Sequence, residues 1–229
     1  LSVGIACAVV GIIVGTASLT SIGMVFGDKI MSIGHESIPL ALLLTAMATM
    51  ILGMGVPTVA AYVIVSLISI PTLLKLGIAP LIAHMFALYF AVLATITPPV
   101  ALSSYAAAAI AGSNPTRTGW VALKLAIPGF VIPFLFVYSP ELLLIGTKSQ
   151  IIWAFITTLL CVLSLSAAIE GFLFRSTTAF ERIILIIGVV FVIVPRLYCD
   201  FIGIIFIMSV LLSQRLKPKN LIASSKTQT

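Results

Sequence analysis

The sequence Gly-Met-Gly-Val-Pro-Thr at positions 53–58 interrupts a long apolar stretch and contains the residues best suited to bind a ligand. Glycine and proline there release backbone N–H and C=O groups from helical hydrogen bonds. In hydrocarbon such groups are tolerated only beside protein or a water-filled cavity. The carbonyls that end the first arm suit a cation such as Na⁺, and the free N–H groups of a helix beginning near Thr58 suit a carboxylate. The alternative is a tight turn between two transmembrane helices, with no ligand.

A second interruption, Thr-Ile-Thr-Pro-Pro-Val, occupies positions 95–100. Each of its two prolines lacks an N–H donor and clashes with the carbonyl four residues earlier, at Ala94 or Thr95. With the hydroxyls of Thr95 and Thr97, these carbonyls predict an oxygen-rich spot that suits a weakly held monovalent cation. The alternative is a proline kink capped by threonine. Because discontinuous helices mark binding sites in transporters, two interruptions close together favour a transport site.

Two further positions carry weaker signals. His84 is an ionisable residue in an apolar stretch, where a functional role is the default hypothesis and a hydrogen-bonded packing role is the alternative. Gly11 and Gly15 form a G-x-x-x-G motif, which predicts close packing of helices or a flexible point near the site.

Composition excludes several classes of protein. Of the 229 residues, 61% are hydrophobic and 8% are charged, against about 25% charged in an average soluble domain. So few charges exclude a soluble enzyme, a nucleic-acid binder and a disordered chain. The sequence also lacks G-x-x-x-x-G-K-[ST], G-x-S-x-G and H-E-x-x-H motifs, and its three cysteines are too widely separated to suggest a metal or disulfide framework. We therefore predict a polytopic membrane protein that is not an enzyme.

The charge-free spans of the first half predict its membrane elements. Residues 1–27 predict one crossing that ends at Asp28-Lys29, and its apolar start without Met or a signal-peptide pattern suggests a fragment of a longer protein. Residues 37–74 are short for two crossings of ~20 residues each, so they predict a re-entrant hairpin whose tip is the first interruption. Residues 76–116 predict a helix broken at the second interruption.

The second half predicts further crossings. Residues 124–140 form the core of one helix and residues 150–169 form the most secure crossing. The apolar region 183–213, interrupted at Pro195-Arg196 and Asp200, fits either one kinked helix or two short ones.

Basic residues in short loops predict the orientation. The loops at 112–124 and 171–182 each contain two basic residues and are separated by two crossings, which places both on the cytoplasmic side. The basic tail after Arg215 lies on the cytoplasmic side with these loops only if the apolar region 183–213 crosses the membrane and returns. The positive-inside rule therefore favours two helices in this region. The hairpin ends, at 28–36 and Lys75, then fall on the outer side.

Several segments occur in the order of a known family. They are LLLTAMATMILGMGVPTVAAYVIV (42–65), LIAHMFALYFAVLATITPPVALSSYAAAAIAG (81–112), TRTGW (116–120) and FVYSPELLL (136–144). This pattern resembles the fused permease of tripartite ATP-independent periplasmic (TRAP) transporters, in its TAXI-associated branch. GIIVGTASLTSIG (11–23) resembles the helix that opens the second half of that permease. The resemblance covers residues 5–145, and residues 146–229 resemble only the variable C-terminal helices.

The resemblance implies Na⁺-coupled uptake of a small organic solute, expected to be a carboxylate, that a periplasmic binding protein delivers. It also implies an all-α inverted-repeat fold of elevator type, in which each half supplies one hairpin and one broken helix. No cofactor is expected besides Na⁺ as the coupling ion. The Na⁺ candidates on this chain are Gly53, Thr95 and Thr97. The solute-binding candidates are Gly55, Pro57, Thr58, Pro98 and Pro99.

The family needs a first repeat, which these residues do not contain. We expect three regions: a second-repeat transport region (1–145) with a helix, a hairpin (37–75), a broken helix (78–112) and a helix (119–145), then C-terminal transmembrane helices (146–214) and a basic cytoplasmic tail (215–229).

The expected partners are the periplasmic binding protein, the missing N-terminal half of the permease, a small membrane subunit and the lipid bilayer, but no nucleic acid. The expected location is the inner membrane of a bacterium or archaeon. Two other functions stay open: an ion channel, which would conduct without saturating and without a binding protein, and a non-transporting membrane scaffold.

Overall fold

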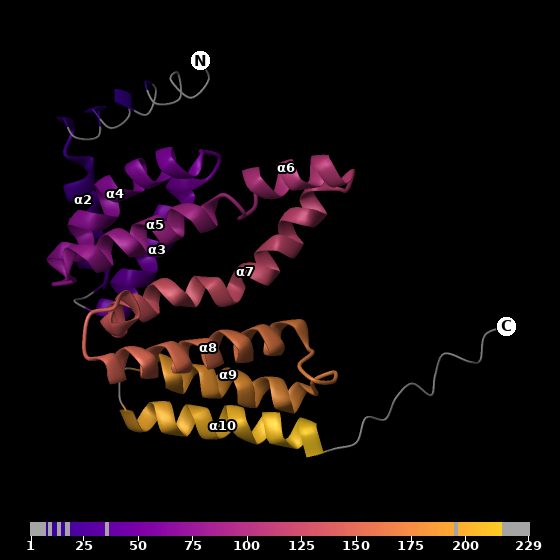
Figure 1. Cartoon of the computed structure of the whole chain (residues 1–229). Helices are drawn as coiled ribbons and strands as arrows, with labels where there is room; N and C mark the ends of the chain where they lie inside the picture. Colours follow the sequence, from indigo (N-terminus) through magenta and orange to yellow (C-terminus); the bar gives the residue numbers. More distant parts are fainter. Residues whose placement is uncertain are drawn as a thin grey trace. The chain divides into compact units, whose positions relative to one another are not determined.

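The computed structural model describes residues 19–34, 37–194 and 197–216, together with residues 8, 11, 12, 15 and 16. These residues contain nine α-helices, one short 3-10 helix and no β-strand (Figure 1). Four of the helices are long and apolar enough to cross a membrane. The predicted all-α polytopic membrane class is therefore confirmed. The chain divides into two compact units, Leu1–Thr147 and Lys148–Thr229.

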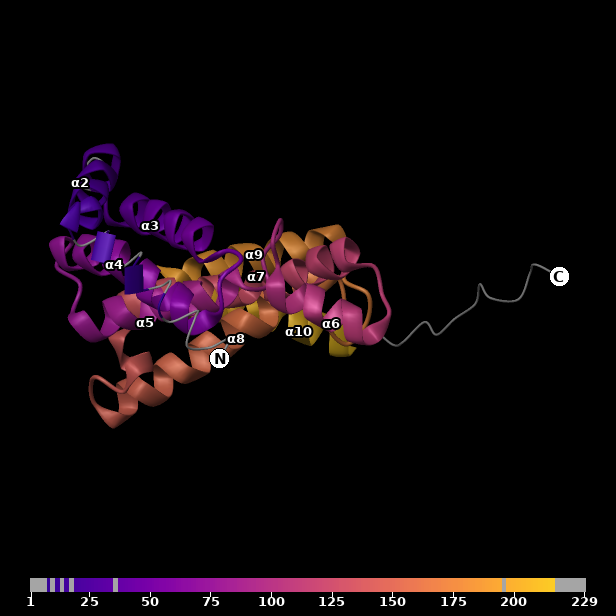
Figure 2. The same ribbon diagram turned by 90° about the horizontal axis from the view of Figure 1, so that it is seen from above.

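A helical hairpin is the main feature of the first unit. Its arms are α3 (Ile38–Gly53) and α4 (Thr58–Lys75), and both pack on α5 (Pro80–Ala94) (Figures 1 and 2). The core between them includes the fully buried side chains of Leu42 and Phe86. With a rise of ~1.5 Å per residue, α3 is about 24 Å long, which is shorter than a ~30 Å hydrocarbon core.

The helix α2 (Ile22–Gly34) precedes the hairpin and packs on both of its arms. It continues through Asp28 and Lys29, where the sequence predicts the end of a membrane crossing, so the helix itself does not end at these charges. The charges are tolerated because both side chains lie at exposed positions and Asp28 forms an ion pair of 2.5 Å with Lys75. This ion pair confirms that the end of α4 and the Asp28 region share one side. Glu36 and most of residues 1–18, with most of the predicted first crossing, lie outside the described residues.

The G-x-x-x-G motif gains no support as a packing site. A Cβ atom added at Gly11 or Gly15 would meet no atom within 4 Å in the described part of the chain.

The broken helix and the helix after it complete the first unit. The chain resumes at α6 (Leu102–Ala111) and continues into α7 (Pro115–Tyr138) and a 3-10 helix, η1 (Pro140–Leu143). The helix α7 begins earlier than the predicted residue 119, because the Asn114 side chain accepts a hydrogen bond of 3.0 Å from the Arg117 N–H and caps the helix. Figure 1 shows α7 bent along its length, as expected for a helix with two internal prolines.

The second unit is a set of three helices that lie side by side: α8 (Lys148–Glu170), α9 (Ala179–Ile193) and α10 (Leu197–Leu216) (Figure 1). The apolar region 183–213 therefore forms two helices, which is the alternative that the basic tail favoured. Contacts between Glu181 and Gln214 place the end of α10 beside the α8–α9 loop, so Arg215 shares that side with the loop arginines. The tail after residue 216 lies outside the described residues.

Candidate functional site

The two sequence interruptions lie in contact with each other. The first forms the hairpin tip, residues 54–57, between α3 and α4. A Cβ atom added at Gly53 would lie 3.0 Å from the Ala94 Cβ atom, at the end of α5. A Cβ atom added at Gly55 would lie 3.1 Å from the Val100 Cγ1 atom, within the second interruption. The absence of side chains at both glycines therefore allows the tip to pack directly on the break.

Gly55 is also required by the backbone. Its φ angle is +78°, in the left-handed region that residues with a Cβ atom rarely adopt. The tip thus depends on this glycine for its turn as well as for its contact with Val100.

The second interruption is a compact loop between α5 and α6. It contains a cis peptide bond between Pro98 and Pro99, and Ala101 adopts a left-handed φ of 38° before α6 begins. The Tyr105 hydroxyl donates a hydrogen bond of 2.7 Å to the Pro99 carbonyl, and so connects α6 to the loop. The predicted break is present between α5 and α6, and the hydrogen bond from Tyr105 of α6 stabilises it.

The carbonyls near the break already have hydrogen-bond partners. The Ala94 carbonyl accepts from the Thr97 N–H at 3.3 Å, and the Thr95 carbonyl accepts from the Ser103 N–H at 3.0 Å. Proline therefore does not leave these two carbonyls without a donor, because Thr97 in the loop supplies one and Ser103 in the first turn of α6 supplies the other. Each carbonyl retains a second lone pair, so neither is excluded as a ligand.

The hydroxyl oxygens of Thr95 and Thr97, at the break, have lone pairs that are free to bind a cation. Thr95 donates to the Val92 carbonyl and Thr97 donates to the Leu93 carbonyl, each at 2.8 Å. Thr95 is 6% exposed and Thr97 is 5% exposed. Because each hydroxyl hydrogen is committed to a carbonyl, the oxygen lone pairs point elsewhere, as a hard cation would require.

The helix at the second side of the tip begins at Thr58, where the sequence predicts a helix N-terminus. Thr58 begins α4, Pro57 precedes it, and no side chain caps this end. The first helical hydrogen bond here runs from the Ala61 N–H to the Pro57 carbonyl at 2.9 Å. The N–H groups before Ala61 therefore carry the partial positive charge that favours an anion. Thr58 is half-buried and Pro57 is exposed.

A residue that the sequence reasoning did not single out also reaches the break. A Cβ atom added at Gly119, in α7, would lie 3.3 Å from the Tyr105 Cε1 atom and 3.6 Å from the Pro98 Cγ atom. The only signal for this contact in the sequence is a glycine inside a helix, which by itself does not identify the neighbour.

His84 forms the hydrogen bond that its packing interpretation predicts. Its Nδ1 atom lies 2.7 Å from the Tyr62 hydroxyl oxygen, which connects α5 to the second hairpin arm. Within the described residues no group of three or more His, Cys, Asp and Glu side chains could hold a metal ion. A concavity of about 360 Å³ lies at the α6–α7 turn and is lined by Ser113, Asn114, Arg117, Thr118 and Val121, none of which belongs to either interruption.

We predict that Tyr62→Phe loosens the hairpin on α5. The lost hydrogen bond is worth about 0.5–1.5 kcal/mol. Thermal unfolding of the purified chain in detergent should therefore shift to lower temperature for this variant. His84→Ala should give a similar shift, and the double variant should add little to either. Fully additive shifts would contradict a shared bond.

Together these features define a class of protein. Long apolar helices that are interrupted inside the apolar region, with the interruptions in contact, are typical of membrane transporters.

The comparison with known families identifies the family. The model of the tripartite ATP-independent periplasmic transporter, DctM component, matches residues 1–151 of the 229, and the chain belongs to this family. The predicted resemblance is therefore confirmed, and the chain is a membrane component of a TRAP-type transporter, which is not an enzyme family. Comparisons with curated proteins and with solved structures gave no match.

Proposed function

We propose that this chain supplies the second repeat of a Na⁺-coupled TRAP permease, which takes up a small organic carboxylate delivered by a periplasmic binding protein. The family supports the transporter class. The observation that carries the finer proposal is the contact of the hairpin tip with the helix break, at Gly55 and Val100. An inverted repeat of elevator type would place a matching hairpin and break, on the missing half, across the solute.

In this proposal Na⁺ binds first. The hydroxyl oxygens of Thr95 and Thr97, with backbone carbonyls near Gly53, supply the hard oxygen ligands that Na⁺ prefers. Because Gly53 packs on the end of α5, a cation shared by the tip and the break would hold the two together.

The solute then binds at an ordered tip. Its carboxylate meets the N–H groups at the start of α4, near Thr58, with Gly55, Pro57, Pro98 and Pro99 forming the surrounding surface. Na⁺ would thereby increase the affinity for the solute, and by linkage the solute would increase the affinity for Na⁺. No charged side chain is required at the site, since the helix dipole supplies the positive end.

The test uses the complete permease that contains this sequence, reconstituted in proteoliposomes with its cognate binding protein and a radiolabelled candidate anion. Uptake should require both an inward Na⁺ gradient and the binding protein, and it should saturate. Flux that is non-saturating and indifferent to the binding protein would indicate a channel. A second assay, Na⁺-dependent protection of the hairpin tip from hydrogen exchange, tests the Na⁺ site even when the solute tried is the wrong one.

We predict that Thr97→Val raises the Na⁺ concentration for half-maximal uptake about tenfold or more, because a polar contact to a charged group is worth about 1.5–3 kcal/mol. Thr97→Ser is the matched control, since it retains the hydroxyl that donates to Leu93. The serine variant should keep near-normal Na⁺ dependence. Unchanged Na⁺ dependence in the valine variant would remove Thr97 from the ligand set.

A further inference from the structure

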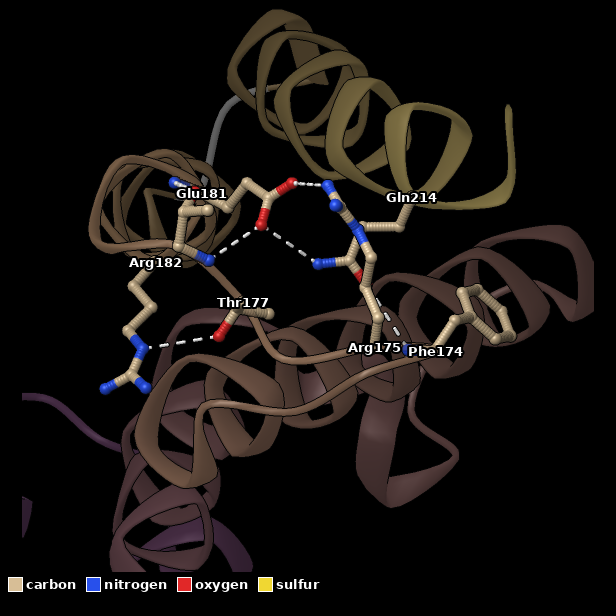
Figure 3. Close-up of polar contacts among 7 residues, drawn as sticks. Phe174, Arg175, Thr177, Glu181, Arg182 and Gln214 are labelled. Atoms are coloured by element: carbon tan, nitrogen blue, oxygen red, sulfur yellow. Dashed lines mark hydrogen bonds and ion pairs between the residues drawn. The ribbon is translucent and has the colours of Figure 1, made fainter. Parts of the chain in front are cut away.

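One end of the C-terminal unit is held together by a buried carboxylate. Glu181, in the first turn of α9, is 8% exposed and accepts a hydrogen bond of 2.7 Å from the Arg175 Nη2 atom. It also accepts from the Thr178 N–H at 2.8 Å and from the Gln214 side chain at 3.2 Å (Figure 3). The α8–α9 loop, α9 and the end of α10 are therefore fixed to one another by a single side chain.

Further hydrogen bonds give the loop itself a defined shape. The Phe174 N–H donates to the Gln214 side-chain oxygen at 3.3 Å, and the Thr177 N–H donates to the Gly171 carbonyl at 2.8 Å. Phe172 and Ser176 form an isolated antiparallel bridge. The side chains at this end are therefore presented by an ordered surface.

This surface combines aromatic and cationic side chains. Phe172, Phe174 and Phe180 are 61%, 49% and 71% exposed. Arg182 and Arg215 are also exposed, and the Arg215 guanidinium lies 5.1 Å from the centre of the Phe174 ring. We name this set of five residues the loop-end surface.

The charge of this end is positive after its internal pairing. Glu181 offsets Arg175, and Glu170 is the other acid at this end of the bundle within the described residues. The Nε atom of Arg175 is buried and has no hydrogen-bond partner in the described part of the chain. The sequence that follows Leu216 adds three lysines and no acid.

Exposed phenylalanine is unfavourable in water, and exposed arginine is unfavourable in hydrocarbon. Both side chains are favourable at the membrane interface, where acyl chains meet headgroups. The ends of membrane-crossing helices such as α8 and α10 lie at this interface. From this complementarity we propose that the loop-end surface binds an anionic phospholipid, with Arg182 and Arg215 as partners of the headgroup phosphate and the phenylalanines against the acyl chains. The family match ends at residue 151, so this site lies outside the matched residues.

The test is native mass spectrometry of the full purified chain in detergent, with equal amounts of phosphatidylglycerol and phosphatidylcholine. The unaltered chain should retain phosphatidylglycerol preferentially. The double variant Arg182→Gln/Arg215→Gln should lose this preference, by about fivefold for each arginine. These two arginines are chosen because neither pairs with Glu181, so the Glu181 contacts with Arg175, Thr178 and Gln214 are kept. The double variant also loses the hydrogen bond of 3.3 Å that the Arg182 Nε atom donates to the Thr177 hydroxyl (Figure 3).

The matched control is Lys29→Gln/Lys148→Gln, which removes the same charge from exposed positions elsewhere in the chain. It should retain the lipid preference. Millimolar inorganic phosphate should not displace the lipid; complete displacement would indicate a simple anion site and overturn the lipid assignment. No preference in the unaltered chain, or equal loss in the control, would also overturn it, and the surface would then be a candidate for contact with a protein subunit.

Discussion

Gly55→Val should reduce solute uptake by the complete permease to about a tenth of its normal rate or less. A β-branched side chain at φ +78° is strained, and its Cβ atom would lie 3.1 Å from the Val100 Cγ1 atom. Backbone strain of about 1–2 kcal/mol and overpacking of about 1–3 kcal/mol both oppose the closed contact between tip and break. The rate is measured as Na⁺-driven uptake in proteoliposomes, at matched amounts of reconstituted protein.

Two further variants separate the contact from the backbone strain. Gly77 has the same φ of +78°, but a Cβ atom added there meets nothing within 4 Å, so Gly77→Val carries the strain without the clash. It should transport better than Gly55→Val. Combining Gly55→Ala with Val100→Ala should restore part of the uptake that Gly55→Ala alone loses. Normal uptake by Gly55→Val would show that the contact is not needed for transport.

Gly203→Ala should destabilise the C-terminal unit by about 1–3 kcal/mol, through overpacking between α9 and α10. A Cβ atom at this position would lie 2.6 Å from the Gly188 carbonyl oxygen and 2.6 Å from the Val192 Cγ2 atom. The helices approach this closely only because both crossing residues are glycine. Hydrogen exchange should therefore accelerate in α9 and α10 of the variant, while α3, α4 and α5 keep their protection.

Gly129→Ala provides the matched control for Gly203→Ala. Gly129 also lies inside a helix, α7, but an added Cβ atom there meets only the Leu93 Cδ2 atom, at 3.9 Å. Alanine in a helix is favoured over glycine by about 1 kcal/mol, so this variant should be at least as stable as the unaltered chain. Equal exchange rates in the two variants would show that the α9–α10 crossing can relax at no cost.

The sequence predicted the interruptions well, because glycine and proline act through the backbone of their own segment. The tip between Gly53 and Thr58 and the break after Ala94 lie where these residues stand. The division of 183–213 into two helices was also indicated, because the basic residues near Arg215 had to return to the side of the other basic loop. The roles of the candidate Na⁺ and solute residues stay predictions.

Two features were missed for different reasons. The start of α7 was placed too late because the Asn114 cap is a local signal that charge counting ignores. The pairing of the Thr95 carbonyl was missed because its donor, Ser103, is supplied only once α6 turns back across the break.

The sequence by itself determined that this is a helical membrane protein of the TRAP permease family and where its helices are interrupted, since composition, proline and glycine act locally. The tertiary structure alone decided that Gly55 meets Val100 and that Glu181 joins Arg175 to Gln214. The contacts of Gly55 with Val100 and of Glu181 with Gln214 join residues that are far apart in the chain, and other apolar or polar residues could have occupied the same places. Only the packing of whole helices selects which ones do.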